Sequence, residues 1–297
     1  MHTVKWGNPP VGLFNFPLDL WAATGRFADF GLRLEPHTHL TGEEYAAQIR
    51  AGAYDFGHIG TPVFLPAAVG SREYAVISAG VCDYAPFYLV AAPGVDSLHD
   101  VRGEPVVINK RQTCPGSLLE WHARREGLDI DAFDVVELMA RSPFDNYGQA
   151  FADGVARDAF RAGILYEPYV SLVERCHGWR VLAEYPELVR PANYALLVYA
   201  RRRLLEQEPD LVRRVLEAYF AAVRFGGEQP QALHGFAEQL PFIAAADIDA
   251  GMRRERRHWN TTPGIDEGLL DRVQDELVAQ RRVPADYDIR DYVATLH

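Results

Sequence analysis

Short apolar strands alternate with helices along most of the chain, and this alternation limits the possible folds more than any other sequence feature. Residues 3–6 are expected to form a strand, the GNPP loop then leads into the apolar stretch 13–23, and a second strand follows at 32–36. A helix over 45–51, with Thr41 as N-cap, precedes a third strand that ends at Ile59. Short joins between such elements are typical of parallel βαβ units, whose ligand-binding loops follow the carboxyl ends of the strands.

The alternation continues beyond a break at Pro93 and Gly94, so we expect a second βαβ module. The further strands that we predict are 76–79, 87–92, 106–108, 135–138, 161–166 and 194–200. Helices are expected over 117–126, after the loop NKRQTCPG, and over 169–176, and the chain is mostly helical after Leu204.

The charge balance excludes some classes of partner. The chain of 297 residues has 30 Lys and Arg against 41 Asp and Glu, a net charge of −11. This excess of negative charge provides no summed positive field for nucleic acid or for an anionic membrane surface. A small-molecule ligand is therefore the expected partner, with no nucleic acid and no membrane insertion. A local arginine or a helix N-terminus can still bind a small anion.

The cysteines and the first residues indicate a compartment. Cys82, Cys114 and Cys176 form no CxxC pair and no even-numbered disulfide framework, which favours a reducing environment. MHTVKWGNPP has no basic region, apolar core or small-residue cleavage site of a signal peptide. We therefore expect a cytoplasmic protein.

Four stretches of the chain resemble the type II periplasmic-binding-protein fold, in the branch of nitrate, alkanesulfonate and thiamine-pyrimidine solute-binding proteins. They are YAAQIRAGAYDFGHIG, FYLVAAPGVDSLHDVRGEPVVIN, GILYEPYVSLVE and RRLLEQEPDLVRRVLEAYFAAV. The resemblance implies an α/β fold of two lobes, a clamshell with mixed, mostly parallel sheets. Lobe one would contain residues 1–86 and 194–297, lobe two residues 87–193, and the ligand would lie between them.

The same branch contains enzymes, but their reactive motifs do not carry over to this chain. Thiamine-pyrimidine synthases have a cysteine-rich run where this chain reads ELVRPANYALL, and a histidine near the position of GTPVF. The desulfinases use a cysteine in the first strand-to-helix loop, and GNPPVGLFNF has none. Both departures argue against those activities.

Cys114 is a candidate catalytic residue because it directly precedes a predicted helix and lies near Lys110 and Arg111. A helix N-terminus and neighbouring cations lower the pKa of a thiol and favour the reactive thiolate. In the alternative interpretation, Thr113 caps the helix and the backbone N–H groups of the loop bind an anionic or carbonyl ligand, with Gly116 and Ser117 at the first turn.

His58 is the second candidate catalytic residue. It lies at the carboxyl end of a predicted strand, where an imidazole can act as a general acid or base near neutral pH. Because it alternates with Phe56, it can equally be a buried, hydrogen-bonded residue of the strand.

Further candidates for ligand binding lie at predicted strand ends and loops. Asn8 and Thr61 belong to loops that follow strands, and Arg141 suits a substrate carboxylate because its guanidinium offers a fork of donors. Asp83 and Glu167 end strands, although an EP dipeptide is also a structural feature in the family. The remaining candidates are the aromatic residues Phe14, Tyr147 and Tyr166, and Asn193 at the return crossing.

His37 and His39 would share one face of an extended segment, and two such imidazoles can bind a metal. No third ligand has a recognisable spacing, so solvated loop histidines are the expected outcome. No metal or cofactor is predicted.

Two main functions follow from these residues. One is a cytoplasmic lyase of the decarboxylase type, in which Cys114 and His58 act from opposite lobes and lobe closure excludes water from a developing carbanion. The alternative is a non-catalytic solute-binding protein that delivers its ligand to the permease of an importer, which requires export. A cytoplasmic ligand sensor is a third possibility, for which no output domain is visible.

Overall fold

The structure is a computed structural model that describes residues 1–9, 12–39, 41–69, 71–138, 146–188, 196–240 and 242–294. Its internal contacts divide the chain into two compact units. Unit 1 comprises Met1–Ala85, Val189–Gln229 and His258–His297, and unit 2 comprises Pro86–Leu188 and Pro230–Arg257. Each unit is built around one five-stranded sheet.

Unit 1 has the strand order β2-β1-β3-β10-β4. The strands are β1 (His2–Asn8), β2 (Leu32–Thr38), β3 (Phe56–Gly60), β4 (Tyr74–Ala79) and β10 (Leu196–Arg201). The helices are α1 (Phe16–Ala23), α2 (Gly42–Arg50), α3 (Thr61–Ala68), α8 (Arg202–Gln207), α9 (Pro209–Glu228) and α11 (Glu267–Ala279). Short 3-10 turns lie at η1 (Leu13–Asn15), η2 (Arg26–Phe30) and η7 (Ile289–Tyr292), and η6 (Arg256–His258) spans the boundary with unit 2.

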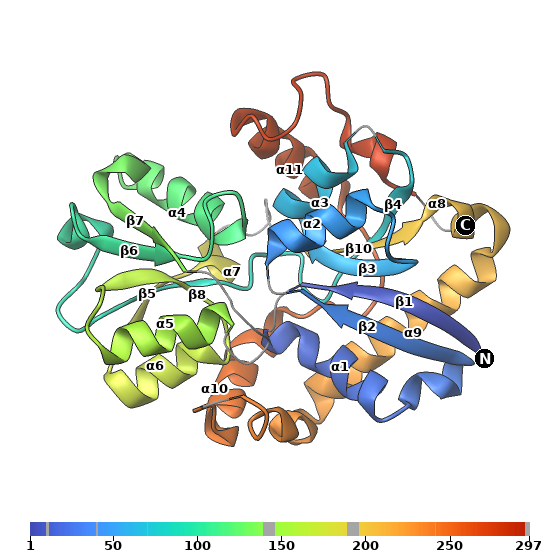
Figure 1. Ribbon diagram of the computed structural model, residues 1–297, viewed down its shortest axis with the longest axis horizontal. Helices are drawn as coiled ribbons and strands as arrows, with labels where there is room; N and C mark the ends of the chain where they lie inside the picture. The colour runs from blue at the N-terminus through green and yellow to red at the C-terminus, as the bar shows by residue number, and fades with distance from the viewer. Residues whose placement is uncertain are drawn as a thin grey trace. The chain divides into compact units, whose positions relative to one another are not determined.

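Strand β10 completes the sheet of unit 1 by pairing antiparallel with both β3 and β4. Strand β1 pairs in parallel with β2 and β3, so β10 alone runs opposite to the other strands of this sheet. Helices α1 and α9 lie on one side of the sheet, and α2, α3 and α11 lie on the other (Figure 1).

The two faces of this sheet bury different side chains because successive residues of a strand point to opposite sides. On the side of α9, the rings of Trp6 and Tyr219 stack with their centroids 5.4 Å apart. On the side of α2 and α3, Tyr199 stacks on Phe64 at 4.9 Å, within a buried cluster that includes Leu270 of α11. Because both faces of the sheet are covered, every residue of β3 and β4 is buried.

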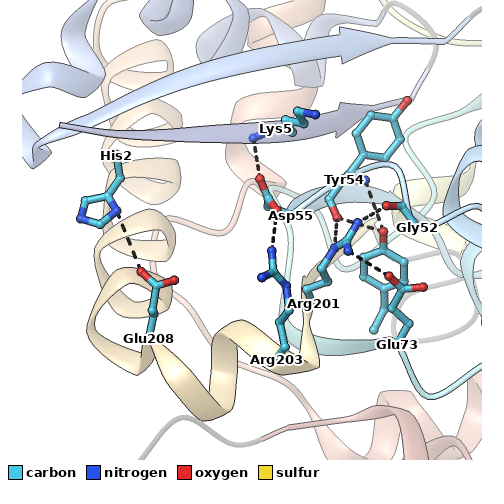
Figure 2. Close-up of polar contacts among 10 residues, drawn as sticks. His2, Lys5, Gly52, Tyr54, Asp55, Glu73, Arg201, Arg203 and Glu208 are labelled. Carbon is cyan, nitrogen blue, oxygen red and sulfur yellow. Dashed lines mark hydrogen bonds and ion pairs between the residues drawn. The ribbon is translucent and has the colours of Figure 1, made fainter.

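Polar contacts at the end of unit 1 where β1 begins join segments distant in sequence (Figure 2). Asp55 accepts a hydrogen bond from the backbone N–H of Lys5 at 3.1 Å. Arg201, at the end of β10, donates through Nε to the carbonyl oxygen of Tyr54 at 2.9 Å and pairs with Glu73 at 3.1 Å. These contacts fix the segment 52–55 that leads into β3.

Unit 2 has the strand order β7-β6-β8-β5-β9, again with one strand, β5, antiparallel to its neighbours. The strands are β5 (Tyr88–Ala91), β6 (Pro105–Ile108), β7 (Asp134–Glu137), β8 (Ala162–Leu165) and β9 (Arg180–Glu184). The helices are α4 (Cys114–Arg125), α5 (Tyr147–Ala156), α6 (Tyr169–His177), α7 (Tyr185–Leu188) and α10 (Ala245–Glu255), with 3-10 turns at η3 (Leu98–Val101), η4 (Ile130–Ala132) and η5 (Pro230–Phe236).

The segment Pro230–Arg257 packs with unit 2, which corrects its predicted place in lobe one. Ion pairs explain the difference. Arg175 of α6 donates to both carboxylate oxygens of Asp247 in α10, at 2.7 and 2.6 Å. Arg254 of α10 pairs with Glu167, and with Glu174 at 2.8 Å. Pairing between positions about 70 to 90 residues apart is invisible to sequence periodicity.

The predicted α/β architecture of two lobes with mixed, mostly parallel sheets is confirmed, since four of the five strands in each sheet share one direction. Strand β9 was missed because its half-buried residues give no clear alternation. Within the residues that the structure describes, no helix has the length and apolar character needed to span a membrane.

Replacing Arg254 with methionine should destabilise unit 2, because it leaves the fully buried carboxylate of Glu167 without its cation. Loss of one partner of a buried pair costs about 3–5 kcal/mol of unfolding free energy. The matched control is Arg257→Met, which removes the more exposed partner of Glu184 and Glu187 and should cost about 1 kcal/mol or less. Urea denaturation measures both variants, and equal losses would contradict this role of Arg254.

Candidate functional site

A chain of hydrogen-bonded polar groups lies at the carboxyl end of β1 in unit 1. The indole N–H of Trp6 donates to Asn8 Oδ1 at 2.8 Å, and Asn8 Nδ2 donates to Asp19 Oδ1 of α1, also at 2.8 Å. Because the indole is only a donor, it fixes the orientation of the Asn8 amide, whose NH₂ group must face Asp19. The sequence predicted Asn8 as a ligand contact, and the structure shows that its side chain positions a carboxyl group.

Asp19 has a pKa raised from 3.8 to about 7, chiefly because burial disfavours its charged form, while the hydrogen bond from Asn8 opposes the shift. The group can therefore exist in both protonation states near neutral pH. A carboxyl group with a pKa near the working pH is suited to transfer a proton. Asp19 was not predicted as a site residue, although it is the only charged residue in the apolar stretch 13–23.

His58 lies near this chain of polar groups and is fully buried in the middle of β3, which corrects its predicted place at the strand's carboxyl end. Its Nδ1 is 2.9 Å from Tyr219 Oη, and its Nε2 is 2.9 Å from Asn15 Oδ1. Burial lowers the pKa of His58 to about 3, so the ring is neutral at physiological pH. This geometry favours the interpretation of His58 as a buried strand residue over that of a general acid or base.

The partners of His58 connect it to the first loop of unit 1. Asn15 Nδ2 donates to the carbonyl oxygen of Pro9 at 3.2 Å, and Tyr219 Oη accepts from the backbone N–H of Val81 at 2.9 Å. His58 therefore helps to hold both the loop after β1 and the loop after β4. Tyr219 lies 161 residues away in the chain, so no local sequence signal indicates this contact.

The other candidates of unit 1 lie near strand ends. Phe14 is buried in η1, and Thr61 is the buried first residue of α3, directly after β3. Asp83 is half-buried after β4. Asn193, like Arg141 in unit 2, lies outside the described residues.

In unit 2, the loop 109–113 folds back over the N-terminus of α4. Thr113 holds the N-cap position, but its hydroxyl contacts the Lys110 carbonyl oxygen at 2.8 Å and does not cap the helix. The backbone N–H of Arg111 donates to Glu137 at 2.8 Å. Gly116 is required here because a Cβ would overlap the carbonyl oxygen of Arg111.

Cys114 is the first residue of α4 and is 8% exposed, and Ser117 in the same turn is fully buried. Burial in this turn favours a structural role for the thiol. The joint action of Cys114 and His58 from opposite lobes stays a prediction.

Tyr147, Tyr166 and Glu167 are buried within unit 2. Tyr147 Oη donates to the carbonyl oxygen of Ile164, and burial raises the pKa of both tyrosines, so they remain protonated. Glu167 accepts from the Ser171 hydroxyl at 2.9 Å and pairs with Arg254. Its geometry is that of a structural carboxylate, which was the alternative interpretation for this residue.

The folding stability should report the shifted pKa of Asp19. The folded state keeps the proton of Asp19 up to about pH 7, whereas the unfolded chain releases it near 3.8. Asp19 therefore favours folding below about pH 4, and this contribution is lost as the pH rises to 7. Denaturation midpoints of the wild type and Asp19→Asn between pH 4 and 8 measure it. Identical pH profiles would contradict the shift.

The contribution of His58 to folding stability should depend on pH in the opposite direction. The unfolded chain binds a proton near pH 6.5 and the folded state only near 3, so the contribution of His58 to stability is present above 6.5 and is lost as the pH falls. In an NMR titration between pH 5 and 8, the His58 ring resonances should not shift. Titration of His58 in that range would rule out its buried, neutral state.

No protein-family model and no curated protein sequence matches the chain. Solved structures, in contrast, match the chain over nearly its full length. The alkanesulfonate-binding protein SsuA from Xanthomonas axonopodis pv. citri, bound to MOPS, matches with a TM-score of 0.79 at 15% identity over 99% of both chains. The periplasmic aliphatic sulphonate-binding protein SsuA from Escherichia coli matches with a TM-score of 0.78 at 17% identity, over 100% of this chain and 93% of its own.

An enzyme is also among the similar structures. A mutant of the desulfurization enzyme DSZB, in complex with biphenyl-2-sulfinic acid, matches with a TM-score of 0.69 at 14% identity, over 99% of this chain and 96% of its own. At these identities the likeness establishes the fold alone. The chain has the type II periplasmic-binding-protein fold that its sequence predicted.

Proposed function

We propose that the chain binds a small organic anion, of the sulfonate or carboxylate class, at the carboxyl ends of the parallel strands of unit 1. The observation that carries the proposal is Asp19, a carboxyl group that Trp6 and Asn8 hold at this edge and whose pKa is about 7. In its protonated form it donates a hydrogen bond to an anionic oxygen. Ligands of open α/β sheets bind outside the carboxyl ends of the strands.

One further observation supports an anionic ligand. Among the structures of similar fold, three are named for sulfonates and one holds a sulfinic acid. The charge of −11 does not oppose this, since distant charges are screened.

The same carboxyl group favours decarboxylation as the reaction, in place of the roles first predicted for Cys114 and His58. The bond between the substrate carbon and its carboxylate breaks, carbon dioxide leaves, and the electron pair stays on carbon. Asp19 then gives its proton to that carbon and regains one from water. A proton donor that is protonated in part at neutral pH fits this step, whereas His58 is neutral and has both ring nitrogens occupied.

Binding is tested by isothermal titration with MOPS, biphenyl-2-sulfinate and benzoate as probes. Asn8→Ala should weaken binding of the preferred probe about tenfold, because the carboxyl group of Asp19 loses its positioning partner. Ser97→Ala, in the capping box of η3 in unit 2, is the control and should bind as the wild type does. Absence of binding to all three probes would overturn the proposed ligand class.

Catalysis is tested separately with a series of aromatic carboxylates, by measuring carbon dioxide release. Asp19→Asn should bind the substrate and release carbon dioxide at least 100-fold more slowly, the typical loss for a general acid. Tight binding without turnover by the wild type would support the alternative of a transport-binding protein. Export of the native protein in cell fractionation would add to that alternative.

A further inference from the structure

Unit 1 has a second polar site on the opposite face of its sheet. A cavity of about 420 Å³ lies at edge strand β2 beside α2, and its lining includes Glu35, His37, His39, Glu44 and Tyr54. The sequence predicted two solvated loop histidines in this region. His37 is exposed on β2, but His39 is 1% exposed, which corrects the prediction for that residue.

The imidazole of His39 is held rigidly. Its ring stacks on Tyr45 with centroids 4.5 Å apart and planes 21° apart, and its Nε2 lies 2.6 Å from Tyr54 Oη. Tyr54 is itself fixed, because its carbonyl oxygen accepts hydrogen bonds from Arg201 and from Tyr74, both at 2.9 Å. In Figure 2 the Tyr54 ring projects away from these anchoring contacts.

The other ring nitrogen, Nδ1, is buried and has no hydrogen-bond partner among the described residues. The carboxylate oxygen Glu44 Oε1 is 3.7 Å from Nδ1, beyond hydrogen-bond distance. When Nε2 donates its proton to Tyr54, the lone pair of the neutral ring is on Nδ1. A buried acceptor without a donor costs free energy, so a ligand that takes this lone pair would be favoured.

His37 completes a pair. The centroids of the two imidazole rings are 5.2 Å apart. Two imidazoles that share a metal at about 2.0–2.1 Å per metal–nitrogen bond, at a tetrahedral angle, have centroids about 5 Å apart.

We propose that His37 and His39 bind a divalent transition-metal ion, Zn²⁺ or Cu²⁺, with Tyr54 as the positioning residue and water completing the coordination. Imidazole suits both ions, and an N–H of a ligating histidine donated to an oxygen is the usual supporting contact. Within the described part of the chain, no group of three or more histidine, cysteine, aspartate or glutamate side chains is arranged for a metal. The site therefore offers two protein nitrogens and open positions.

The test uses the full chain with Zn²⁺ alone in isothermal titration and Cu²⁺ alone in electron paramagnetic resonance. One equivalent of metal should bind, and the Cu²⁺ spectrum should show hyperfine coupling to two nitrogens. His37→Ala, at an exposed position, should weaken binding tenfold or more, and Tyr54→Phe about tenfold. His99→Ala, an exposed histidine of unit 2, is the matched control and should leave binding unchanged.

One further variant separates a loss of metal binding from a loss of folding. His39→Phe retains a ring to stack on Tyr45, and its thermal unfolding shows whether a loss of metal binding is a loss of folding. Metal binding that is unchanged in His37→Ala, or that is lost in His99→Ala, would mean that surface histidines bind the metal only adventitiously and would overturn the proposal. This outcome is independent of anion binding, because Asp19 and Asn8 are not altered.

Discussion

The antiparallel pairing of β10 with β3 and β4 is the interaction on which unit 1 depends. Val198 lies opposite His58 in that pairing, although 140 positions separate them in the chain. Once β10 is in place, the following helix α9 covers the sheet and brings Tyr219 within 2.9 Å of His58. The loop after β1 is then held through Asn15 and the Pro9 carbonyl oxygen. A long-range backbone pairing thus determines the position of side chains that no local preference could place.

Burial determines the protonation states of Asp19 and His58 in unit 1. Asp19 and His58 both shift toward their neutral forms, because a low-dielectric surrounding penalises charge on either group. The loss of charge has different consequences for the two groups. A neutral carboxyl group gains a proton that it can donate near pH 7, whereas a neutral imidazole with both nitrogens occupied has nothing left to exchange. Asp19 is therefore the candidate for proton transfer, whereas His58 holds neighbouring residues in place through its hydrogen bonds.

The two faces of the unit 1 sheet carry separate polar sites for a geometric reason. Side chains alternate across a strand, so Trp6 and Asn8 of β1 face α1 and α9, whereas Lys5 borders the cavity at His37 and His39. A substitution on one face leaves the contacts of the other intact. This separation is the reason that the two proposed sites can be tested independently.

The alternation of strands and helices was enough to predict an α/β fold of two modules, because apolar periodicity and N-caps such as Thr41 are local properties. It also located Asn8, Thr61 and the loop 109–117 at strand or helix ends. Tertiary structure alone decided the protonation of Asp19 and the hydrogen bonds at both ring nitrogens of His58. It also decided the ion pairs that place α10 in unit 2 and the burial of His39. Each of these depends on a partner or a surrounding supplied by distant residues. A sequence read along the chain contains the residue types, but the dielectric surroundings and the hydrogen-bond partners exist only after folding.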